Sequence, residues 1–433
     1  FDILYLFFIL LSFPLWLKFI FKKEYRRILR YRLSPQIEAG NEKRIWIHAV
    51  SVGEVKSVKS LIEQLNRQFD LQIVLSVTTP SGFRFAQKEY KNINIKIIYA
   101  PIDFSFTVKK FLKAVNPAIL LLNELEIWPN WILKTEKEKI PILLINGRIS
   151  ENAFKRYNFF KFILERFVAK IDLFMVQADI YKEKFAQLNI PAERLVVCGN
   201  IKADTAFEAA GMLPSDREIF NYLRLDGAAE NKRILTLAST HASDERALIP
   251  LINKLQEKFS LIIVPRHLNR LPELKNMLAA HKLKYTCWSE PGKNECRTGV
   301  LLFDNMGYLF NIMKISDIVF MGGTFDKKTG GHNLYEPAVL GKLIVGGPFY
   351  NNFPDIGREL VERGVFKVFS DVGRLAGFLL DSDKIDFAGI KEQAIAAVAA
   401  RRGSAACILK EIQARLPRSV DCAGGEKHDF PGK

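Results

Sequence analysis

The chain has 433 residues, of which 48% are hydrophobic, which predicts two or three folded domains and excludes global disorder. Its 63 Lys and Arg exceed its 47 Asp and Glu, and the net charge of +16 favours anionic lipids, phosphorylated substrates or nucleic acid as partners. No zinc-knuckle spacing, RNP-like motif or Arg-rich tail supports nucleic acid. Five widely spaced cysteines without a CxxC motif predict neither a disulfide framework nor a structural zinc site, and they indicate a reducing compartment.

The chain opens with an apolar segment. Residues 3–17 carry no charge, and residues 19–21 extend the run past Lys18 to about the minimum length of a bilayer span. The Lys and Arg residues that follow predict a cytoplasmic position for the next domain. A signal peptide would instead carry its charges before the apolar run. An in-plane helix and a buried core helix stay as alternatives, because the run is short and contains Pro14.

From residue 44 onward, short apolar runs alternate with helical segments. Helices are predicted between the runs, for example at residues 54–68 and from Thr79 onward. Continuous apolar strands separated by helices are typical of a parallel sheet that is covered on both faces. The predicted strands of the first half are residues 44–50, 71–77, 95–99, 118–123, 141–145 and 173–176.

The alternation pauses between Gly199 and Asp226, which predicts a domain boundary, and then resumes. We therefore expect two doubly wound α/β domains. The predicted strands of the second half are residues 234–238, 261–264, 284–288, 300–303, 318–321 and 343–345, and terminal helices are predicted at residues 390–416. The expected parts are a membrane anchor with its basic flank (1–30), a first Rossmann-like domain (31–210), a linker (211–226), a second Rossmann-like domain (227–416) and a loose tail (417–433).

Ligands of such domains bind beyond the carboxyl ends of the strands, so the loops after the strands hold the candidate functional residues. After the first strand come Ser51, Gly53, which suits a tight turn, and Glu54 at a helix start. Glu54 is either a first-turn carboxylate stabilised by the helix dipole or a general base. The helix N-terminus is expected to lower the pKa of Glu54, which would weaken it as a base.

Later loops of the first half also carry charges. Glu124 and Glu126 precede Pro129, which suits the first position of a helix. We expect at most one of these two carboxylates to point into a site, and a plain acidic helix start is the alternative. Arg148 and Lys202 are cations at strand ends, where a phosphate or a carboxylate would bind.

In the second half, Ser239 and Thr240 follow the first strand. Arg266, after the second strand, offers a planar group for a carboxylate, a phosphate or a pyrimidine edge, while a lone histidine such as His267 is more often structural.

The loop after residue 321 contains two Gly-Gly pairs, the first being Gly322 and Gly323, which permit a close approach of backbone to ligand. Asn333 stands where a helix cap and an anion site are expected, although Glu336 also fits a plain capping box.

Several common motifs do not occur in the sequence. It has no GxGxxG after the first strand, no GxxxxGK[ST], no GxSxG and no HExxH. A nicotinamide dehydrogenase, a P-loop enzyme and a catalytic metal are therefore disfavoured, and no cofactor is expected.

Together these motifs resemble the 3-deoxy-D-manno-octulosonic acid (Kdo) transferase family of lipopolysaccharide biosynthesis. They occur in the family's order across almost the whole chain. The resemblance implies a GT-B fold with two domains facing a central cleft, CMP-Kdo as donor, a lipid A precursor (lipid IVA) as acceptor, and no metal. The matching stretches are residues 48–54, 124–130, 146–150, 199–202, 265–267 and 322–338.

By the family pattern, Glu54 corresponds to the general base for the acceptor hydroxyl, and Glu124 matches a second acidic motif position. The first domain is then the acceptor side and residues 227–416 the CMP-Kdo side. The residues expected at the donor are Lys202, Arg266, His267, Gly322, Gly323, Asn333 and Glu336. Possible further substrate contacts are Ser51, Gly53, Arg148, Ser239 and Thr240.

The expected location is the bacterial inner membrane, with a single N-terminal anchor and the catalytic domains on the cytoplasmic face of this anionic membrane. Two alternatives stay open. One is another GT-B nucleotide-sugar transferase or epimerase, which a uracil-specific donor pocket would mark. The other is a membrane-tethered protein that binds anionic lipid without catalysis.

Overall fold

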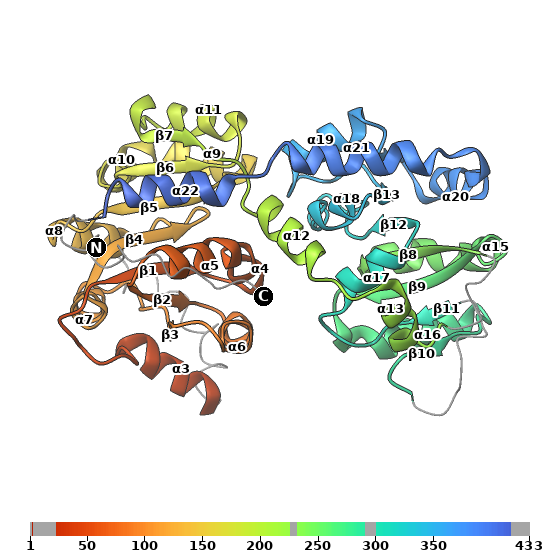
Figure 1. Ribbon diagram of the computed structural model, residues 1–433, viewed down its shortest axis with the longest axis horizontal. Coiled ribbons are helices and arrows are strands. Elements are labelled where there is room, and N and C mark those ends of the chain that lie inside the picture. The colour runs from red at the N-terminus through yellow and green to blue at the C-terminus, as the bar shows by residue number, and fades with distance from the viewer. Residues whose placement is uncertain (1, 3–22, 226–231, 291–299, 417–433) are drawn as a thin grey trace, which may run out of the picture. The chain divides into compact units, whose positions relative to one another are not determined.

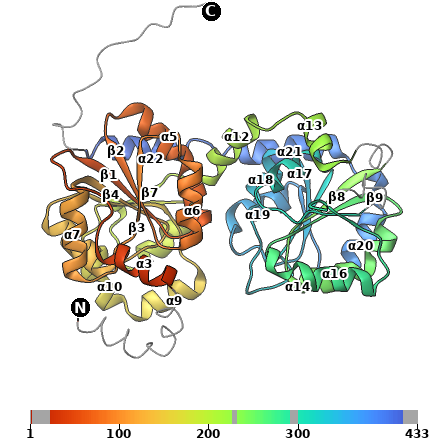
Figure 2. The same ribbon diagram turned by 90° about the horizontal axis from the view of Figure 1, so that it is seen from below.

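The computed structural model of the protein describes residues 2, 23–225, 232–290 and 300–416, which form two compact units (Figure 1). Unit 1 comprises Phe1–Thr205 and Gly403–Lys433, and unit 2 comprises Ala206–Arg402. Each unit contains one parallel sheet of seven strands with helices on both faces (Figure 2). The predicted fold class of two parallel-sheet α/β domains is therefore confirmed.

The predicted membrane anchor and the predicted tail lie almost entirely outside the described residues. Within the described part of the chain, no helix combines the length and the apolar character that a bilayer span requires. The basic flank forms helix α3 (Lys23–Leu33), and Arg32 Nε donates a hydrogen bond to the carbonyl oxygen of Ala100. This flank is therefore attached to unit 1.

The sheet of unit 1 has the strand order β3-β2-β1-β4-β5-β6-β7. Its strands are β1 (Arg44–Ala49), β2 (Gln72–Val77), β3 (Ile95–Tyr99), β4 (Pro117–Asn123), β5 (Ile142–Gly147), β6 (Leu173–Val176) and β7 (Leu195–Val197). Its helices are α3, α4 (Val52–Ser57), α5 (Lys59–Gln68), α6 (Pro80–Glu89), α7 (Ser105–Val115), α8 (Pro129–Lys137), α9 (Glu151–Phe159), α10 (Lys161–Val168), α11 (Asp179–Gln187), the start of α12 (Lys202–Gly211) and α22 (Ser404–Gln413), with a 3-10 turn η1 (Ala192–Arg194).

The central strand β1 is buried on both faces. Its side chains alternate, so Ile45 and Ile47 pack into the core shared with α4, α5 and α22, while Trp46 packs against Trp131 of α8 on the opposite face. Burial on both faces explains why the strands of this sheet appear in the sequence as continuous apolar runs.

Helix α22 returns to unit 1 after the chain has completed unit 2, as Figure 1 shows. Ile408 and Ile412 pack into the core of unit 1, and the Asp204 carboxylate accepts hydrogen bonds from Gly403 N–H and Ala405 N–H. The sequence analysis placed these residues in the second domain, because periodicity reveals an apolar helix face but not the surface that covers it.

A disulfide joins Cys198, at the end of β7, to Cys407 of α22. The prediction that the cysteines form no disulfide framework is wrong for this pair. The two residues are 209 positions apart in the sequence, so only the return of α22 brings them together.

The sheet of unit 2 has the strand order β10-β11-β9-β8-β12-β13-β14. Its strands are β8 (Arg233–Thr240), β9 (Phe259–Pro265), β10 (Thr286–Cys287), β11 (Val300–Leu302), β12 (Ile318–Met321), β13 (Leu343–Gly346) and β14 (Phe366–Val368). Its helices are the rest of α12, α13 (Asp216–Leu223), α14 (Ala242–Leu248), α15 (Ile252–Leu255), α16 (Leu271–Ala280), α17 (Leu309–Ile315), α18 (Tyr335–Val339), α19 (Pro354–Glu362), α20 (Val372–Leu380) and α21 (Phe387–Ala399), with 3-10 turns η2 (Ile249–Leu251), η3 (Leu268–Arg270) and η4 (Ser382–Lys384).

Most of the expected linker 211–226 is ordered helix. Ser215 caps α13 through a capping box with Glu218, and Ile219 and Leu223 are buried in a core that includes Ile312 of α17. The absence of strand pattern in this stretch reflects two consecutive helices, α12 and α13, between the sheets.

Candidate active site

Each sheet has a switch point, where two neighbouring strands lead the chain toward opposite edges of the sheet. In unit 1 it lies between the neighbouring strands β1 and β4, and in unit 2 between β8 and β12. Open parallel sheets bind ligands at such switch points, beyond the carboxyl ends of the strands. Glu54 and Glu124 follow the first pair of strands, whereas Thr240 and Gly322 stand at the ends of the second pair.

The Glu54 carboxylate folds back over the first turn of α4. Its Oε2 accepts a hydrogen bond from Val50 N–H at 2.9 Å, and its Oε1 accepts one from the Ser51 hydroxyl at 3.3 Å. Ser51 is the N-cap and accepts from Glu54 N–H. These contacts show that Glu54 helps to form the helix start, and they also hold its carboxylate in one position at the switch point.

Burial raises the pKa of Glu54 to about 7. The negative charges of Glu124 and Glu126 contribute to this rise in the pKa, and the hydrogen bonds from Val50 and Ser51 oppose it only in part. The prediction that the helix N-terminus lowers this pKa is therefore wrong, because desolvation by the surrounding loops outweighs the local dipole. A carboxyl group with a pKa near the working pH suits a general base.

Gly53 lies within α4 and is exposed. Its φ is not in the left-handed region, and a Cβ there would make an ordinary contact at 3.8 Å with Ser51 Oγ. Gly53 was expected to allow a tight turn after the first strand, and the structure instead places it within the first turn of a helix.

Glu124 follows β4 with a left-handed φ of 60°. Its Oε2 accepts from Arg148 Nε at 2.9 Å, and its Oε1 lies 3.6 Å from Lys202 Nζ. Arg148 follows β5, and Lys202 is the first residue of α12. The structure thus brings Glu54, Glu124, Arg148 and Lys202 into one charge cluster, in which Glu124 is already paired with cations.

Glu126 was discussed in the sequence analysis but not selected as a site residue. Its carboxylate accepts a hydrogen bond from Trp128 Nε1 at 2.8 Å. Burial raises the pKa of Glu126 to about 7, and the Trp128 hydrogen bond opposes that rise. Pro129, as predicted, is the first residue of the following helix α8.

A chain of buried amides supports the two cations and was missed from the sequence. Gln177 Nε2 donates to the carbonyl oxygen of Asn146, and Asn200 Nδ2 donates to Gln177 Oε1. Asn200 Oδ1 then accepts from Lys202 N–H. Asn146 and Asn200 belong to the stretches that carry the family resemblance, so that resemblance was the available signal for them.

In unit 2, the ends of β8 and β12 lie in close contact. A Cβ at Gly322 would clash with the carbonyl oxygen of Ser239, and Gly323 has a left-handed φ of 73°. The Asp244 carboxylate joins the two loops, since its Oδ2 accepts from His241 N–H at 2.9 Å and from Gly323 N–H at 2.8 Å. The glycines therefore shape this edge of the sheet.

The remaining candidates of unit 2 differ in their availability to a ligand. Thr240 Oγ1 donates to the buried Glu245, which pairs with Arg270, so this hydroxyl already has an internal partner. Arg266 and His267 are exposed in the loop after β9.

At the start of α18, Asn333 Oδ1 accepts from Tyr335 N–H at 3.1 Å. The N-cap of this helix is Leu334, which makes no side-chain capping hydrogen bond, so the prediction that Asn333 occupies the cap position is wrong by one residue. Glu336 lies in the first turn of α18. Two further histidines, His241 and His332, meet at this edge with their Nε2 atoms 2.8 Å apart. Neither histidine was predicted as a site residue, because the two are 91 residues apart in the sequence.

Two parallel-sheet units with polar loops at both switch points define an α/β protein with two ligand-binding edges. The family described as 3-deoxy-D-manno-octulosonic-acid transferase (kdotransferase) matches residues 25–205. The Kdo transferase of Haemophilus influenzae is 32% identical over 338 residues, covering 76% of this chain and 77% of that protein. A bifunctional glycosyltransferase/methyltransferase of Fusobacterium nucleatum is 33% identical over 349 residues, covering 79% of this chain but only 53% of that protein.

Among solved structures, a glycosyltransferase from Rickettsia africae shares the fold, with a TM-score of 0.60 at 16% identity over 88% of this chain and all of that one (100%). The protein belongs to the 3-deoxy-D-manno-octulosonic acid transferase family, and it is a glycosyltransferase that uses Kdo. Family membership decides against the non-catalytic alternative.

Proposed function

We propose that the protein transfers Kdo from CMP-Kdo to a lipid A precursor, lipid IVA, by direct displacement without a metal and with Glu54 as the general base. Family membership supports Kdo transfer. The observation that carries the mechanism is the pKa of Glu54, raised to about 7 by burial at the switch point of unit 1. The GT-B arrangement, with both edges facing one cleft, stays a prediction of this proposal.

In the proposed step, a hydroxyl group of the acceptor gives its proton to the Glu54 carboxylate. The hydroxyl oxygen bonds to the anomeric carbon of Kdo while the bond from that carbon to the phosphate oxygen of CMP breaks. The electron pair leaves with the CMP phosphate. A base whose pKa lies near neutrality is ionised often enough to accept the proton and basic enough to draw it from the hydroxyl.

The cations of both units support anionic substrates. Lys202 is proposed as a donor contact, and in the structure it is paired with Glu124, so binding to a donor phosphate exchanges one anionic partner for another. In unit 2, the exposed Arg266 supports the binding of CMP, because it is a planar cation in the loop after β9. Gly322 and Gly323 let the ends of β8 and β12 pack closely and so shape the edge at which CMP is proposed to bind.

A lipid acceptor is further supported by exposed aromatic residues at the junction of α9 and α10. Phe159 is 82% exposed and Phe162 is 74% exposed, and the neighbouring Phe160 and Ile163 are also exposed. We call these four residues the aromatic surface. The Arg166 guanidinium lies 5.5 Å from the centre of the Phe162 ring, and Lys155 and Arg156 of α9 are exposed. Apolar side chains flanked by cations are typical of contact with an anionic membrane surface.

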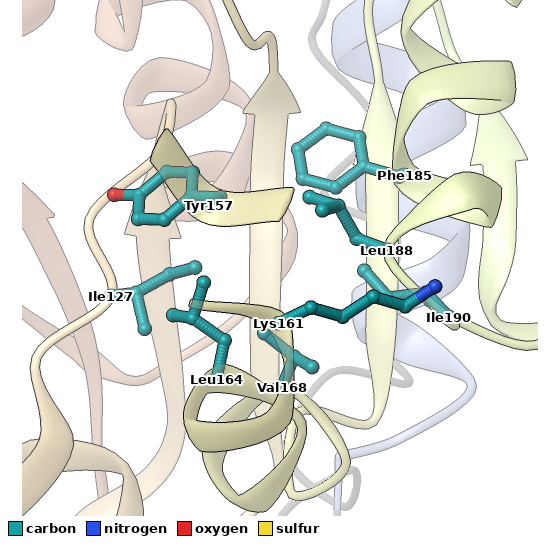
Figure 3. A pocket seen from close by; sticks show the side chains of 8 residues that line it. All are labelled: Ile127, Tyr157, Lys161, Leu164, Val168, Phe185, Leu188 and Ile190. Atoms are coloured by element: carbon teal, nitrogen blue, oxygen red, sulfur yellow. The ribbon is translucent and has the colours of Figure 1, made fainter. Parts of the chain in front are cut away.

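The helices that carry the aromatic surface, α9 and α10, also line a pocket that Ile127 shares. Figure 3 shows a small apolar pocket between α9, α10 and α11, toward which side chains of all three helices point. Ile127, which lies next to Glu126, contributes to the same pocket. The lining residues are Ile127, Tyr157, Lys161, Leu164, Val168, Phe185, Leu188 and Ile190. An inner-membrane location with an N-terminal anchor remains part of the proposal, and the aromatic surface adds a second contact.

The direct test is Glu54→Gln, which keeps the shape of the side chain but removes the basic site. General base catalysis is typically worth roughly 100- to 10,000-fold, so Kdo transfer to lipid IVA should fall by about that factor. CMP binding should be unchanged, because Glu54 is not among the proposed donor contacts. Transfer is measured by mass spectrometry of the lipid product, and CMP binding by titration calorimetry.

The matched control is Glu151→Gln. Glu151 is also a first-turn glutamate of a helix in unit 1, but it is exposed and paired with Lys184. This variant should transfer Kdo at the wild-type rate. A Glu54→Gln enzyme within a few-fold of wild type would contradict the mechanism and leave Glu54 as a helix-capping residue.

The donor is tested separately with CMP, UMP and UDP. The proposal predicts that CMP binds most tightly. Tighter binding of UDP would instead indicate a different nucleotide sugar as donor.

A further inference from the structure

Two histidines meet at the switch point of unit 2. His241 is the N-cap of α14, directly after β8, and His332 belongs to the loop between β12 and α18. Their Nε2 atoms lie 2.8 Å apart, and their rings are parallel within 4°. The backbone at His241 is fixed by Asp244, which also holds Gly323 N–H. The contact therefore lies at the junction of the two loops that form the donor edge.

The distance between the Nε2 atoms limits the protonation of the pair. A hydrogen bond between two imidazole nitrogens needs one N–H and one lone pair, so at least one ring is neutral. Burial, together with the charges of Arg266, His241 and His267, lowers the pKa of His332 to about 3. Burial also lowers the pKa of His241. Without a ligand, both rings are therefore neutral at pH 7.

The charged groups around the pair are three cations and two carboxylates, one of which is the buried Asp244 that accepts from His241 N–H and whose pKa burial raises to about 6. Arg266 and His267 come from the loop after β9, and Arg270 comes from the 3-10 turn η3; all three lower the pKa of His241. Asp326, from the loop after β12, raises it. The positive charges disfavour protonation of the pair while no ligand is bound, and they favour the binding of an anion. The negative charge of a bound anion would in turn favour protonation of the pair.

We propose that His241 and His332 together take up one proton when an oxyanion of the donor binds at the carboxyl edge of β8 and β12. The proton comes from solvent. The hydrogen bond between the two rings breaks, and each Nε2–H then donates toward the oxyanion. The oxyanion is a phosphate or a carboxylate, and CMP-Kdo contains both, so this inference rests on the proposed donor. Donor binding is then tighter at lower pH, as long as the phosphate stays ionised.

The test uses calorimetric titration of the full chain with CMP between about pH 6.5 and pH 8, above the second pKa of about 6 of a phosphate monoester. Buffers with different ionisation enthalpies give the number of protons taken up. The variants are His332→Asn and His241→Asn, which keep a polar side chain. His281→Asn is the matched control, because His281 is an exposed histidine of unit 2 at the end of α16.

Wild type and His281→Asn should take up more protons per CMP than the two pair variants, by up to about one. As the pH rises across this range, the CMP affinity of wild type and of His281→Asn should also fall by about 3- to 10-fold more than the CMP affinity of the two pair variants. The same variants are compared for the KM of CMP-Kdo, which adds the carboxylate. If the pH profiles of wild type and the pair variants differ with CMP, the phosphate is the group that the histidines bind. If they differ only with CMP-Kdo, the histidines bind the carboxylate.

Equal proton uptake and equal pH profiles in wild type and both pair variants, with CMP and with CMP-Kdo, would overturn the inference and leave the donor assignment intact. Failure of the wild type to bind CMP at any pH would overturn the donor assignment together with the inference. The two failures are therefore distinguishable.

Discussion

The two units have the same kind of sheet and different chemistry at the carboxyl edge. In unit 1, the switch point holds Glu54 with its pKa raised to about 7, beside the carboxylate of Glu124 and two cations. In unit 2, the carboxylate at the switch point, Asp244, is occupied by two backbone N–H groups, and the edge consists of glycines, histidines and the exposed Arg266. The fold thus repeats one kind of sheet edge, and the proposed function assigns proton removal to the edge of unit 1 and oxyanion binding to the edge of unit 2.

The comparison predicts that a substitution which distorts the carboxyl edge of unit 2 weakens the binding of CMP. Gly322→Ala forces a Cβ against the carbonyl oxygen of Ser239, so the ends of β8 and β12 must move apart. A displacement of about 1 Å at a site can cost roughly 100-fold, and we expect CMP affinity to fall by about that factor. Titration calorimetry measures it.

Gly377→Ala is the control for this prediction, since Gly377 lies inside α20 of unit 2 and an added Cβ there meets no atom within 4 Å. It should bind CMP like the wild type. Normal CMP binding by a folded Gly322→Ala chain would show that the donor does not use this edge.

The aromatic surface belongs to unit 1, so the proposed membrane contact adds a second difference between the two units. Replacing Phe159 and Phe162 by Ser removes two exposed rings from this surface. Complete burial of such a ring contributes roughly 1.5–3 kcal/mol, so binding to anionic vesicles should weaken by about tenfold for each residue. Vesicle sedimentation measures the loss, and Phe106→Ser on α7, which is 54% exposed, is the control. Equal binding by the double variant and the control would rule out a specific membrane contact at this surface.

The smallest effect is expected from Glu124→Gln. The charge of Glu124 raises the pKa of Glu54, so its removal should lower the pH at which transfer reaches half of its maximum. The maximal rate should fall much less than in Glu54→Gln. A loss as large as that of Glu54→Gln, without a shift in the pH profile, would instead make Glu124 the base.

The sheets were predictable because their strands are buried on both faces. β3, β6 and β12 have the boundaries that the apolar runs predicted. β14 was not predicted, because residues 366–368 contain a lysine and are only partly buried. The division into units was less accessible, since the surface that receives α22 lies hundreds of residues earlier in the chain.

Local rules also failed where tertiary burial dominates. The helix start at Glu54 indicated a lowered pKa, but the surrounding loops and two neighbouring carboxylates raise it. Similarly, the pairing of His241 with His332 and of Cys198 with Cys407 depends on how distant loops and helices pack. Sequence position alone contains no signal for such contacts.

The central claim, that Glu54 of unit 1 removes the proton, is tested most directly by the pH dependence of single-turnover Kdo transfer in wild type and Glu54→Gln. A base must be ionised to act, so the wild-type rate should rise with pH and level off above the Glu54 pKa of about 7. Below that pKa the rate should fall about tenfold for each pH unit. The residual rate of Glu54→Gln should lack this inflection. A wild-type rate that does not change through neutral pH, or the same inflection in both proteins, would contradict the account.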